Sequence, residues 1–380
     1  MPRYVNPEIL SWARERAGFT IDMIAKSMKK DPAEVASWES GTVVPSYSVL
    51  ERLAQKLFKV PVAVFYFPEP PDIEDPMNSF RRLPEYELMR FSPDTLGKIR
   101  LLQAFKESLV ELDAARLVSR RVINDIKPSI EDNLVQLSER VRDYVGVSLA
   151  QQIQTASAES AVKLWRHALE VCGIFTFKDS LKDSFVSGFC IIDPQYPVIM
   201  INNSTAFSRQ LFTLIHETAH ILYQVNGVTD ESEEYFAYLE QDERNIEIRC
   251  NALAGEILVP RRDFSRDAIL IQIEGVKAIP SLAEKYSVSR EVILRRLLDL
   301  GLVSRDYYRQ RAAEFAEDYR RATPRRPGGN YYLTKMAYLG EGFTGITYQH
   351  LRAGRISPQE AANHLNINAR NLAKFERYLR

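Results

Sequence analysis

Short amphipathic helical patterns follow one another through the first 67 residues of the chain. Apolar residues recur at helical spacing in the runs ILSWARERAG, IDMIAKSMKK, AEVASWESG and SVLERLAQKLF, and a shorter apolar run, PVAVFYF, follows them. Asn6, Thr20 and Asp31 stand where helix N-caps are needed, and Gly18 can end the first helix. The pattern predicts a compact domain of five short helices over residues 1–67.

The pattern then changes twice. Residues 68–92 are polar and rich in proline, which predicts a linker. Residues 93–155 return to helical spacing, with many Leu, Arg, Glu and Lys, so we expect two or three long helices that form a connector. In residues 156–262 a helical run is followed by three β-branched and aromatic runs, GIFTFKD, VSGFCIID and PVIMINN, and then by another helix. The fold class we predict is mainly α with a small β-sheet, in which Met200 to Asn203 form the strand beside a cleft.

Two further helix pairs follow this core. In residues 263–326 the run SLAEKYSVSREVILRRLLDLGLV predicts a helix, a turn and a helix, with Arg290, Arg295 and Arg296 on one positive face. This pair is either a nucleic-acid-binding unit or a lid that packs on the preceding core. Residues 331–380 form a last helical unit, in which EAANHLNINARNLAKFERYL again predicts a helix, a turn and a helix.

Composition narrows the class of protein. The 380 residues contain 50 Lys+Arg and 50 Asp+Glu, so net charge makes no case for nucleic acid or membrane as a partner. Three cysteines are an odd, sparse set, which is typical of reduced thiols in a cytosolic protein. We expect no signal peptide, because the first residues lack a continuous apolar core, and no membrane span. The expected location is the cytoplasm.

Two of the five histidines lie in the run FTLIHETAHIL, as His216-Glu217-Thr218-Ala219-His220. On a helix, residues i and i+4 project from one face, so both imidazoles can bind one zinc ion. The glutamate beside the first histidine can then take a proton from a water at the metal. The alternative is a structural role without a metal, in which two core histidines form hydrogen bonds to backbone or carboxylate groups.

A zinc site needs a third protein ligand, and residues 230–256 are rich in carboxylates. Glu247 is the best candidate, because small residues on the same predicted helix permit close approach to the helix of His216 and His220. Glu243, one turn earlier, is its main rival. Asn251, one turn after Glu247, is suited to hydrogen-bond to a metal-ligating side chain without binding the metal itself.

The runs RQLFTLIHETAHIL and EIRCNALAGEILVP resemble those of the ImmA/IrrE family of metallopeptidases, although Cys250 stands where alanine is usual. The resemblance implies a zincin-like metallopeptidase core over residues 156–262. It implies zinc held by His216, His220 and Glu247, with Glu217 as the catalytic base. Arg209 and Thr213 of the first run belong with Asn251 around these ligands. Manganese or iron can replace zinc in such a ligand set.

The first 67 residues resemble an XRE/Cro-type helix-turn-helix domain, with Trp38-Glu39-Ser40-Gly41 closing its third helix. Such a domain reads DNA through the third helix. Here that helix offers no Arg, Lys, Gln or Asn to base edges. The residues available for DNA are Lys26, Lys29, Lys30 and Ser37. Sequence-specific DNA binding and a role in dimerisation or in docking a substrate both stay open.

Three functional hypotheses follow. The first is a regulatory zinc metalloendopeptidase that cleaves a helix-turn-helix repressor or antitoxin-type partner under stress or phage induction, as the family resemblance implies. The second is a DNA-binding transcriptional regulator whose peptidase domain is a sensor or inactive. The third is a metal-dependent hydrolase that acts on a substrate other than protein. No feature of the sequence supports this third hypothesis. The donor that would stabilise the oxyanion is open, and the candidates are Tyr196, Tyr223, Tyr235 and His167.

Overall fold

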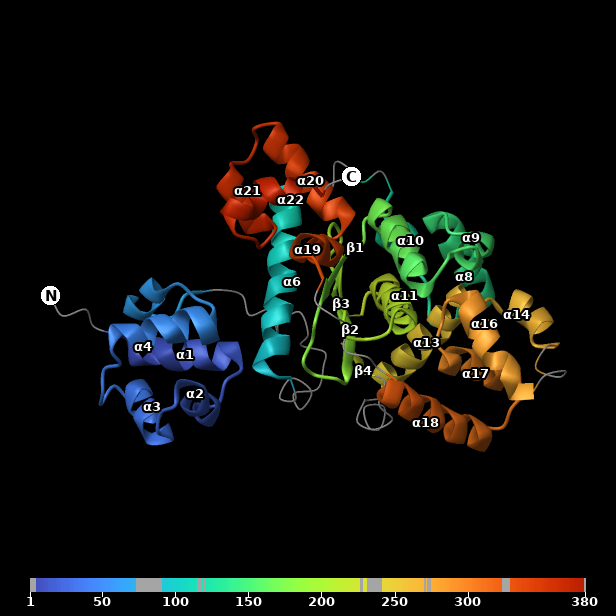
Figure 1. Cartoon of the computed structure of the whole chain (residues 1–380), viewed down its shortest axis with the longest axis horizontal. Helices are drawn as coiled ribbons and strands as arrows, with labels where there is room; N and C mark the ends of the chain where they lie inside the picture. Colours follow the sequence, from blue (N-terminus) through green and yellow to red (C-terminus); the bar gives the residue numbers. More distant parts are fainter. Residues whose placement is uncertain are drawn as a thin grey trace. The chain divides into compact units, whose positions relative to one another are not determined.

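The helices of the N-terminal bundle begin at the caps that the sequence predicts. The computed structural model describes residues 5–72, 91–114, 118, 120–225, 228–230, 241–269, 271, 275–322 and 329–378. Its two compact units are residues 1–101 and residues 102–380. In the first unit the side chains of Asn6, Thr20 and Asp31 each accept a hydrogen bond from a backbone N–H in the first turn of a helix. The elements are α1 (Pro7–Ala17), α2 (Ile21–Met28), α3 (Pro32–Glu39), α4 (Tyr47–Arg52), η1 (Leu53–Phe58) and η2 (Val62–Tyr66) (Figure 1).

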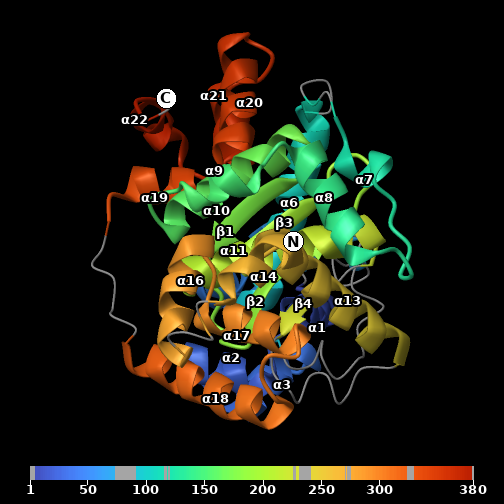
Figure 2. The same ribbon diagram turned by 90° about the vertical axis from the view of Figure 1, so that its right-hand side faces the viewer.

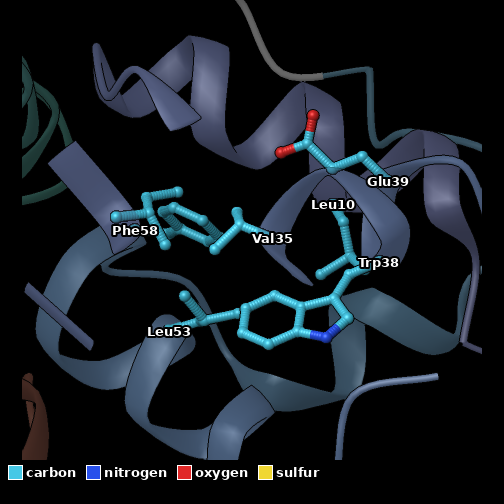
Figure 3. A pocket seen from close by; sticks show the side chains of 7 residues that line it. Leu10, Val35, Trp38, Glu39, Leu53 and Phe58 are labelled. Carbon is cyan, nitrogen blue, oxygen red and sulfur yellow. The ribbon is translucent and has the colours of Figure 1, made fainter. Parts of the chain in front are cut away.

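The first unit has a hydrophobic core of its own. Trp38 and Val35 of α3 point into it beside Leu53 and Phe58, with Glu39 at the edge of the group (Figure 3). The carboxylate of Glu39 pairs with Arg14 of α1, with Nε and Oε1 2.7 Å apart. This ion pair and the buried indole fix α3 to α1.

The second unit is helical except for one small sheet, which confirms the predicted fold class. Helix α6 (Pro93–Glu111) crosses the boundary between the units at residue 101. Before the sheet come α7 (Val122–Asp125), α8 (Leu134–Val145), α9 (Leu149–Ile153) and α10 (Ala158–Val171). The sheet and its central helices are β1 (Phe175–Asp179), β2 (Val186–Ile191), β3 (Val198–Asn202), α11 (Phe207–Tyr223), β4 (Val228–Asp230) and α13 (Gln241–Leu258). After them come α14 (Arg261–Asp267), η5 (Gly275–Lys277), α16 (Ala278–Tyr286), α17 (Arg290–Asp299), α18 (Arg305–Ala322), α19 (Tyr331–Leu339), α20 (Glu341–Arg352), α21 (Pro358–His364), η6 (Ala369–Asn371) and α22 (Leu372–Glu376).

The strand order corrects one expectation. The four strands lie in the order β1-β3-β2-β4, with β1 and β3 parallel and the other pairs antiparallel. Met200 to Asn203, expected to form the strand beside a cleft, lie in and directly after β3, which is not an edge of the sheet. Met200 of β3 pairs with Phe177 of β1 and with Phe189 of β2, so the hydrogen bonds of β3 are used on both sides. Among the described strands, the edges of the sheet are β1 and β4.

One hydrophobic core joins the elements that position the site. Side chains from α8, α10, α11 and α13 meet in it, and Leu282 of α16 and Ile293 of α17 belong to the same core. Figures 1 and 2 show α16, α17 and α18 following one another beside this core. Helix α18 packs on α17, where Asp318 binds Arg290 at 3.1 Å and Phe315 lies under its guanidinium. None of the described helices is long and apolar enough to cross a membrane.

Candidate metal centre

Helix α11 carries the His-Glu-x-x-His run through the middle of the core. Its apolar residues contact α10 on one side and α13 on another, and β2 crosses it as well. His216, Glu217 and His220 are all buried, with relative exposures of 0, 0 and 1%. The helix ends directly after the run, because Gln224 adopts a left-handed conformation at φ 57°.

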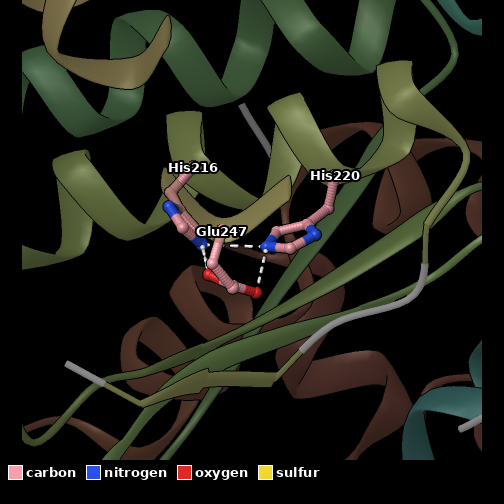
Figure 4. A group of neighbouring side chains, drawn as sticks. All are labelled: His216, His220 and Glu247. Carbon is pink, nitrogen blue, oxygen red and sulfur yellow. Dashed lines mark hydrogen bonds and ion pairs between the residues drawn. The ribbon is translucent and has the colours of Figure 1, made fainter. Parts of the chain in front are cut away.

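Three potential ligand atoms converge on one point. His216 Nε2 lies 2.9 Å from His220 Nε2, as expected for residues one turn apart on α11. Glu247 of α13 reaches both rings, with Oε1 3.0 Å from His220 Nε2 and Oε2 3.4 Å from His216 Nε2. Figure 4 shows both imidazoles extending from α11 toward this carboxylate. Among the described residues, this is the one group of His, Cys, Asp and Glu side chains with the spacing of a metal site.

The geometry of the group fits a tetrahedral cation. Zinc bonds of about 2.0–2.2 Å to nitrogen and oxygen separate the ligand atoms by about 3.4 Å. The three distances of 2.9, 3.0 and 3.4 Å lie within half an ångström of that edge. His220 Nδ1 lies 3.2 Å from the carbonyl of Val225, so an Nδ1–H donated there leaves the Nε2 lone pair for the metal. The residues present therefore fit a divalent ion with three protein ligands.

The electrostatics of the group favour a positive charge at this point. Burial alone would raise the pKa of Glu247, but His220 and His216 hold it far below its usual range, so the carboxylate is ionised. Burial likewise opposes protonation of His220, yet Cys250 and Glu247 raise the pKa of His220 well above its usual value. The same negative field attracts a metal cation, which competes with the proton for Nε2.

Glu217 lies on the side of α11 that faces β2. The two elements pass close to each other at Gly188, where a β-carbon would stand 3.8 Å from Glu217 Cγ. The same β-carbon would stand 2.6 Å from Thr213 Cγ2 and 2.8 Å from the carbonyl oxygen of Met200. Gly188 therefore lets the strand pass close beside the helix turn that carries the glutamate.

The structure brings together some of the residues that the sequence singles out and separates others. His216, His220 and Glu247 form one cluster, and the rival carboxylate Glu243 is not part of it. Arg209 is directed at β2, where Nε and Nη2 donate to Ser187 Oγ at 3.0 and 2.8 Å.

The remaining supporting residues lie apart from the ligand atoms. Thr213 is buried against Gly188, and its hydroxyl has no hydrogen-bond partner within the described residues. The half-buried side chain of Asn251 makes no hydrogen bond to a ligand in the part of the chain that the structure describes.

Sequence reasoning missed two neighbours of the site. Cys250, noted in the sequence only because alanine is usual at its position, is a buried free thiol of the core that also lies against His220 and raises the pKa of that ring. Ser187 was not singled out, although it holds Arg209. The available signal was the isolated glycine in VSGFC, because a glycine inside a strand marks close approach by another element.

The candidates for an oxyanion donor are scattered. Tyr196 is buried, and its backbone N–H bonds to Asp193 Oδ1 at 2.9 Å. Tyr223 accepts a hydrogen bond from Arg249 Nε at 3.3 Å. His167 is exposed on α10, and Tyr235 lies outside the described residues. Within the described residues, His167 is not part of the cluster of His216, His220 and Glu247.

The residues expected to meet DNA lie on the surface of the first unit. Lys26, Lys29 and Lys30 are exposed, and Lys30 Nζ pairs with Glu34 Oε1 at 2.8 Å. Ser37 is half-buried and donates its hydroxyl proton to the carbonyl of Glu34 at 2.6 Å. The groove-facing side of α3 therefore presents an acidic residue that is already paired.

Two family models match the chain. Residues 169–298 match the IrrE N-terminal-like domain, a peptidase family, and residues 10–65 match the helix-turn-helix family. The first match covers the sheet, α11 and α13, and it continues through α16 and most of α17. No curated protein matches the chain.

Proposed function

We propose that this chain is a zinc-dependent regulatory metallopeptidase. The proposal is supported by the joining of an IrrE N-terminal-like peptidase domain to an XRE-type helix-turn-helix domain, as in ImmA/IrrE proteins. The substrate of the chain is a helix-turn-helix repressor or an antitoxin-type partner. The observation that carries the proposal is the convergence of His216 Nε2, His220 Nε2 and a Glu247 oxygen from two helices.

The chain's own residues divide the work of peptide hydrolysis. His216, His220 and Glu247 would hold the ion, which supplies a Lewis acid for water and for the scissile carbonyl. Glu217, buried beside His216, accepts the proton of the attacking water and passes it to the leaving amine. The full burial of Glu217 excludes bulk water from its carboxylate. Two imidazoles and one carboxylate are a common ligand set of catalytic zinc, although manganese and iron also accept it.

The substrate class rests on the pairing of domains in one chain. A helix-turn-helix domain beside a peptidase can dock a protein of its own class or bring the peptidase to DNA where a repressor sits. The three cysteines are free and buried, which suits a reducing compartment, and we place the protein in the cytoplasm.

A second candidate function is a DNA-binding transcriptional regulator whose peptidase domain is a sensor or inactive. The match of residues 10–65 to helix-turn-helix domains favours it. Under this hypothesis DNA binding survives both chelation and loss of Glu217.

Glu217→Gln tests the first proposal, because the substitution keeps the shape of the side chain but removes the base. Cells that produce the wild-type chain or the variant are compared by sequencing new protein N-termini, and metal content is measured on both purified proteins. We expect new termini in a helix-turn-helix protein with the wild type alone and equal metal content in both. Glu243→Gln is the control and cleaves as the wild type does. Identical termini with and without Glu217 would contradict the proposal.

A further inference from the structure

The chain contains three helix-turn-helix units that are built in the same way. In each, the turn after the first helix contains a residue in the left-handed conformation: Lys29 at φ 56°, Ser287 at φ 59° and Asn366 at φ 49°. The first unit is α2 and α3, the second is α16 and α17, and the third is α21 followed by η6 and α22. Positive φ is uncommon outside glycine, so its recurrence at the turn is a specific likeness.

The backbone hydrogen bonds of the three turns also correspond. Four residues before the left-handed residue stands an alanine, and the residue after it donates its N–H to that alanine's carbonyl. The bonds are Lys30 N to Ala25 O at 2.9 Å, Val288 N to Ala283 O at 3.0 Å and Ile367 N to Ala362 O at 3.0 Å. These are the 6→1 bonds of a Schellman turn.

The second helices start and pack in the same register. Two residues after the left-handed residue, the side chains of Asp31, Ser289 and Asn368 cap the next helix. Six residues after it, Val35, Ile293 and Leu372 are buried. Because the cap and the buried residue stand at the same positions in all three units, the three second helices expose equivalent faces. The exposed residues of these faces can therefore be compared position by position.

Two of these outer faces are poorly suited to DNA. Helix α3 exposes Ala33 and offers Glu34, which already binds Lys30. The face of α17 is covered by α18, because Arg290 binds Asp318 and Arg295 lies over the ring of Tyr308.

The third face is basic and open. Arg370, Lys374 and Arg377 are all exposed at positions i, i+4 and i+7, with the small residue Ala373 exposed between them. Within the described residues, neither Lys374 nor Arg377 has an ion-pair partner, and the neighbouring acid, Glu376, binds Arg352 at 3.0 Å. The three cations extend from the 3-10 turn η6 through α22 to its C-cap residue, Arg377, so one short and continuous helical segment carries them.

We propose that the C-terminal unit, α20 to α22, is a second DNA-binding module, which places the segment of Ala369 to Glu376 in the major groove of duplex DNA. Arg370, Lys374 and Arg377 bind phosphates on its two walls, and the guanidinium groups are suited to guanine edges as well. This function is separate from the metal centre and does not depend on peptidase activity.

The module and the preceding helix α19 are fixed to the peptidase core by hydrogen bonds to a buried ion pair within α10, Arg166 and Glu170. Arg166 of α10 donates to the carbonyls of Ala337 and Tyr338 in the last turn of α19, and Glu170 accepts from the N–H of Gly342 in α20 at 3.1 Å. Gly340 and Gly342 lie so close that a β-carbon would stand 2.5 and 2.8 Å from the oxygens of Glu170. DNA bound by α22 is therefore held at a fixed place relative to α10 and the sheet.

The test measures binding of the full-length chain to a fluorescent random-sequence duplex of about 30 base pairs, over about 50–200 mM salt. The variant Arg370→Gln, Lys374→Gln, Arg377→Gln removes the three cations. We expect its affinity to fall at least about tenfold and its salt slope to decrease by about 3. The matched variant Arg370→Lys, Lys374→Arg, Arg377→Lys keeps the charges and most of the binding. Glu217→Gln binds as the wild type does.

A second charge variant, Lys26→Gln, Lys29→Asn, Lys30→Gln, tests the N-terminal domain with the same loss of charge. Asparagine is chosen at position 29 because it tolerates the left-handed conformation. Circular dichroism and thermal unfolding confirm that each variant is folded. The proposal is overturned if the C-terminal glutamine variant keeps the wild-type affinity and salt slope. It is equally overturned if the wild-type chain does not bind the duplex at the lowest salt.

Discussion

At the scale of single residues, Gly188 is the tightest contact beside the candidate metal centre. A β-carbon at Gly188 would stand 2.6 Å from Thr213 Cγ2 of α11 and 2.8 Å from the backbone oxygen of Met200 in β3, so Gly188→Ala must shift β2 against both elements. We expect a loss of about 1–3 kcal/mol in the free energy of unfolding, measured with urea. Thr213→Ser removes the methyl group on the other side and should recover part of this loss.

The control for this prediction is Gly345→Ala. Gly345 lies inside α20 with no atom within 4 Å of the added carbon, so the substitution should stabilise by about 0.5–1 kcal/mol. Equal effects of the two substitutions would show that Gly188 is not a packing constraint.

Glu247 is distinguished from the other carboxylates by its contacts with both rings. Glu247→Gln removes the negative charge that holds the cation between His216 and His220. Loss of a residue that only hydrogen-bonds to a metal ligand typically lowers metal affinity by about 10–100-fold. We expect a larger fall in zinc affinity for Glu247→Gln, as measured by competition with a chelator. Glu243→Gln is the matched control and should bind zinc normally. A variant of Glu247 with unchanged affinity would remove this residue from the ligand set.

The sequence predicts the two histidines well, because i, i+4 spacing on a helix needs no knowledge of tertiary structure. It favours Glu247 over Glu243 only through the small residues around it. The place of Cys250 against His220 is beyond the sequence, because it depends on how α11 and α13 pack across the core. The same is true of the contact between Arg209 and Ser187, which joins a helix to a strand.

At the scale of elements, a buried polar network holds the end of α13. Arg142 of α8 donates to the carbonyl of Ile257 at 2.7 Å and to Gln152 Oε1 at 2.6 Å. Gln152 Nε2 donates to the carbonyls of Leu258 and Tyr286, which end α13 and α16. Burial lowers the pKa of Arg142 to about 10, so the guanidinium is still charged at neutral pH. The network satisfies carbonyls that a helix end leaves without partners.

Gln152→Ala leaves these buried groups without their partner. We expect the free energy of unfolding to fall by about 3 kcal/mol, because a buried group that loses its hydrogen bond keeps its desolvation cost. Gln154→Ala, at an exposed position two residues later, is the control and should change stability by less than about 0.5 kcal/mol. Urea unfolding of both variants measures the difference, and similar losses would argue against a structural role for the network.

Helix starts were predictable from the sequence because a cap is a local device. The side chains of Asn6, Thr20 and Asp31 all accept the expected hydrogen bonds. The order of the strands was not predictable, because β2 and β3 are buried along their whole length. Strands buried on both faces are continuous apolar runs without alternation, so nothing in PVIMINN shows that β3 lies between two partners.

At the scale of the whole molecule, the hydrophobic core of the first unit and the core around the metal centre are separate clusters of the described residues. The core of the first unit contains Ile9, Trp38 and Phe65 and no part of the metal centre. The core of the second unit contains apolar residues of α11 and α13, the helices that carry all three ligands. A metal ion that ties these two helices together therefore stabilises one core and leaves the other unchanged.

Removal of the metal should accordingly be seen in one unfolding transition only. A ligand that binds the folded state at 100 to 1,000 times its dissociation constant adds about 3–4 kcal/mol of stability. In scanning calorimetry we expect a chelator to lower the melting temperature of the second unit, while the transition of the helix-turn-helix unit keeps its temperature. Glu247→Gln should show the lower temperature without chelator and no further change with it. If chelation left the transition of the second unit unchanged, the cluster of His216, His220 and Glu247 would not bind an ion in the folded chain, because binding to the folded state always adds stability. If chelation moved both transitions equally, the two units would not unfold separately.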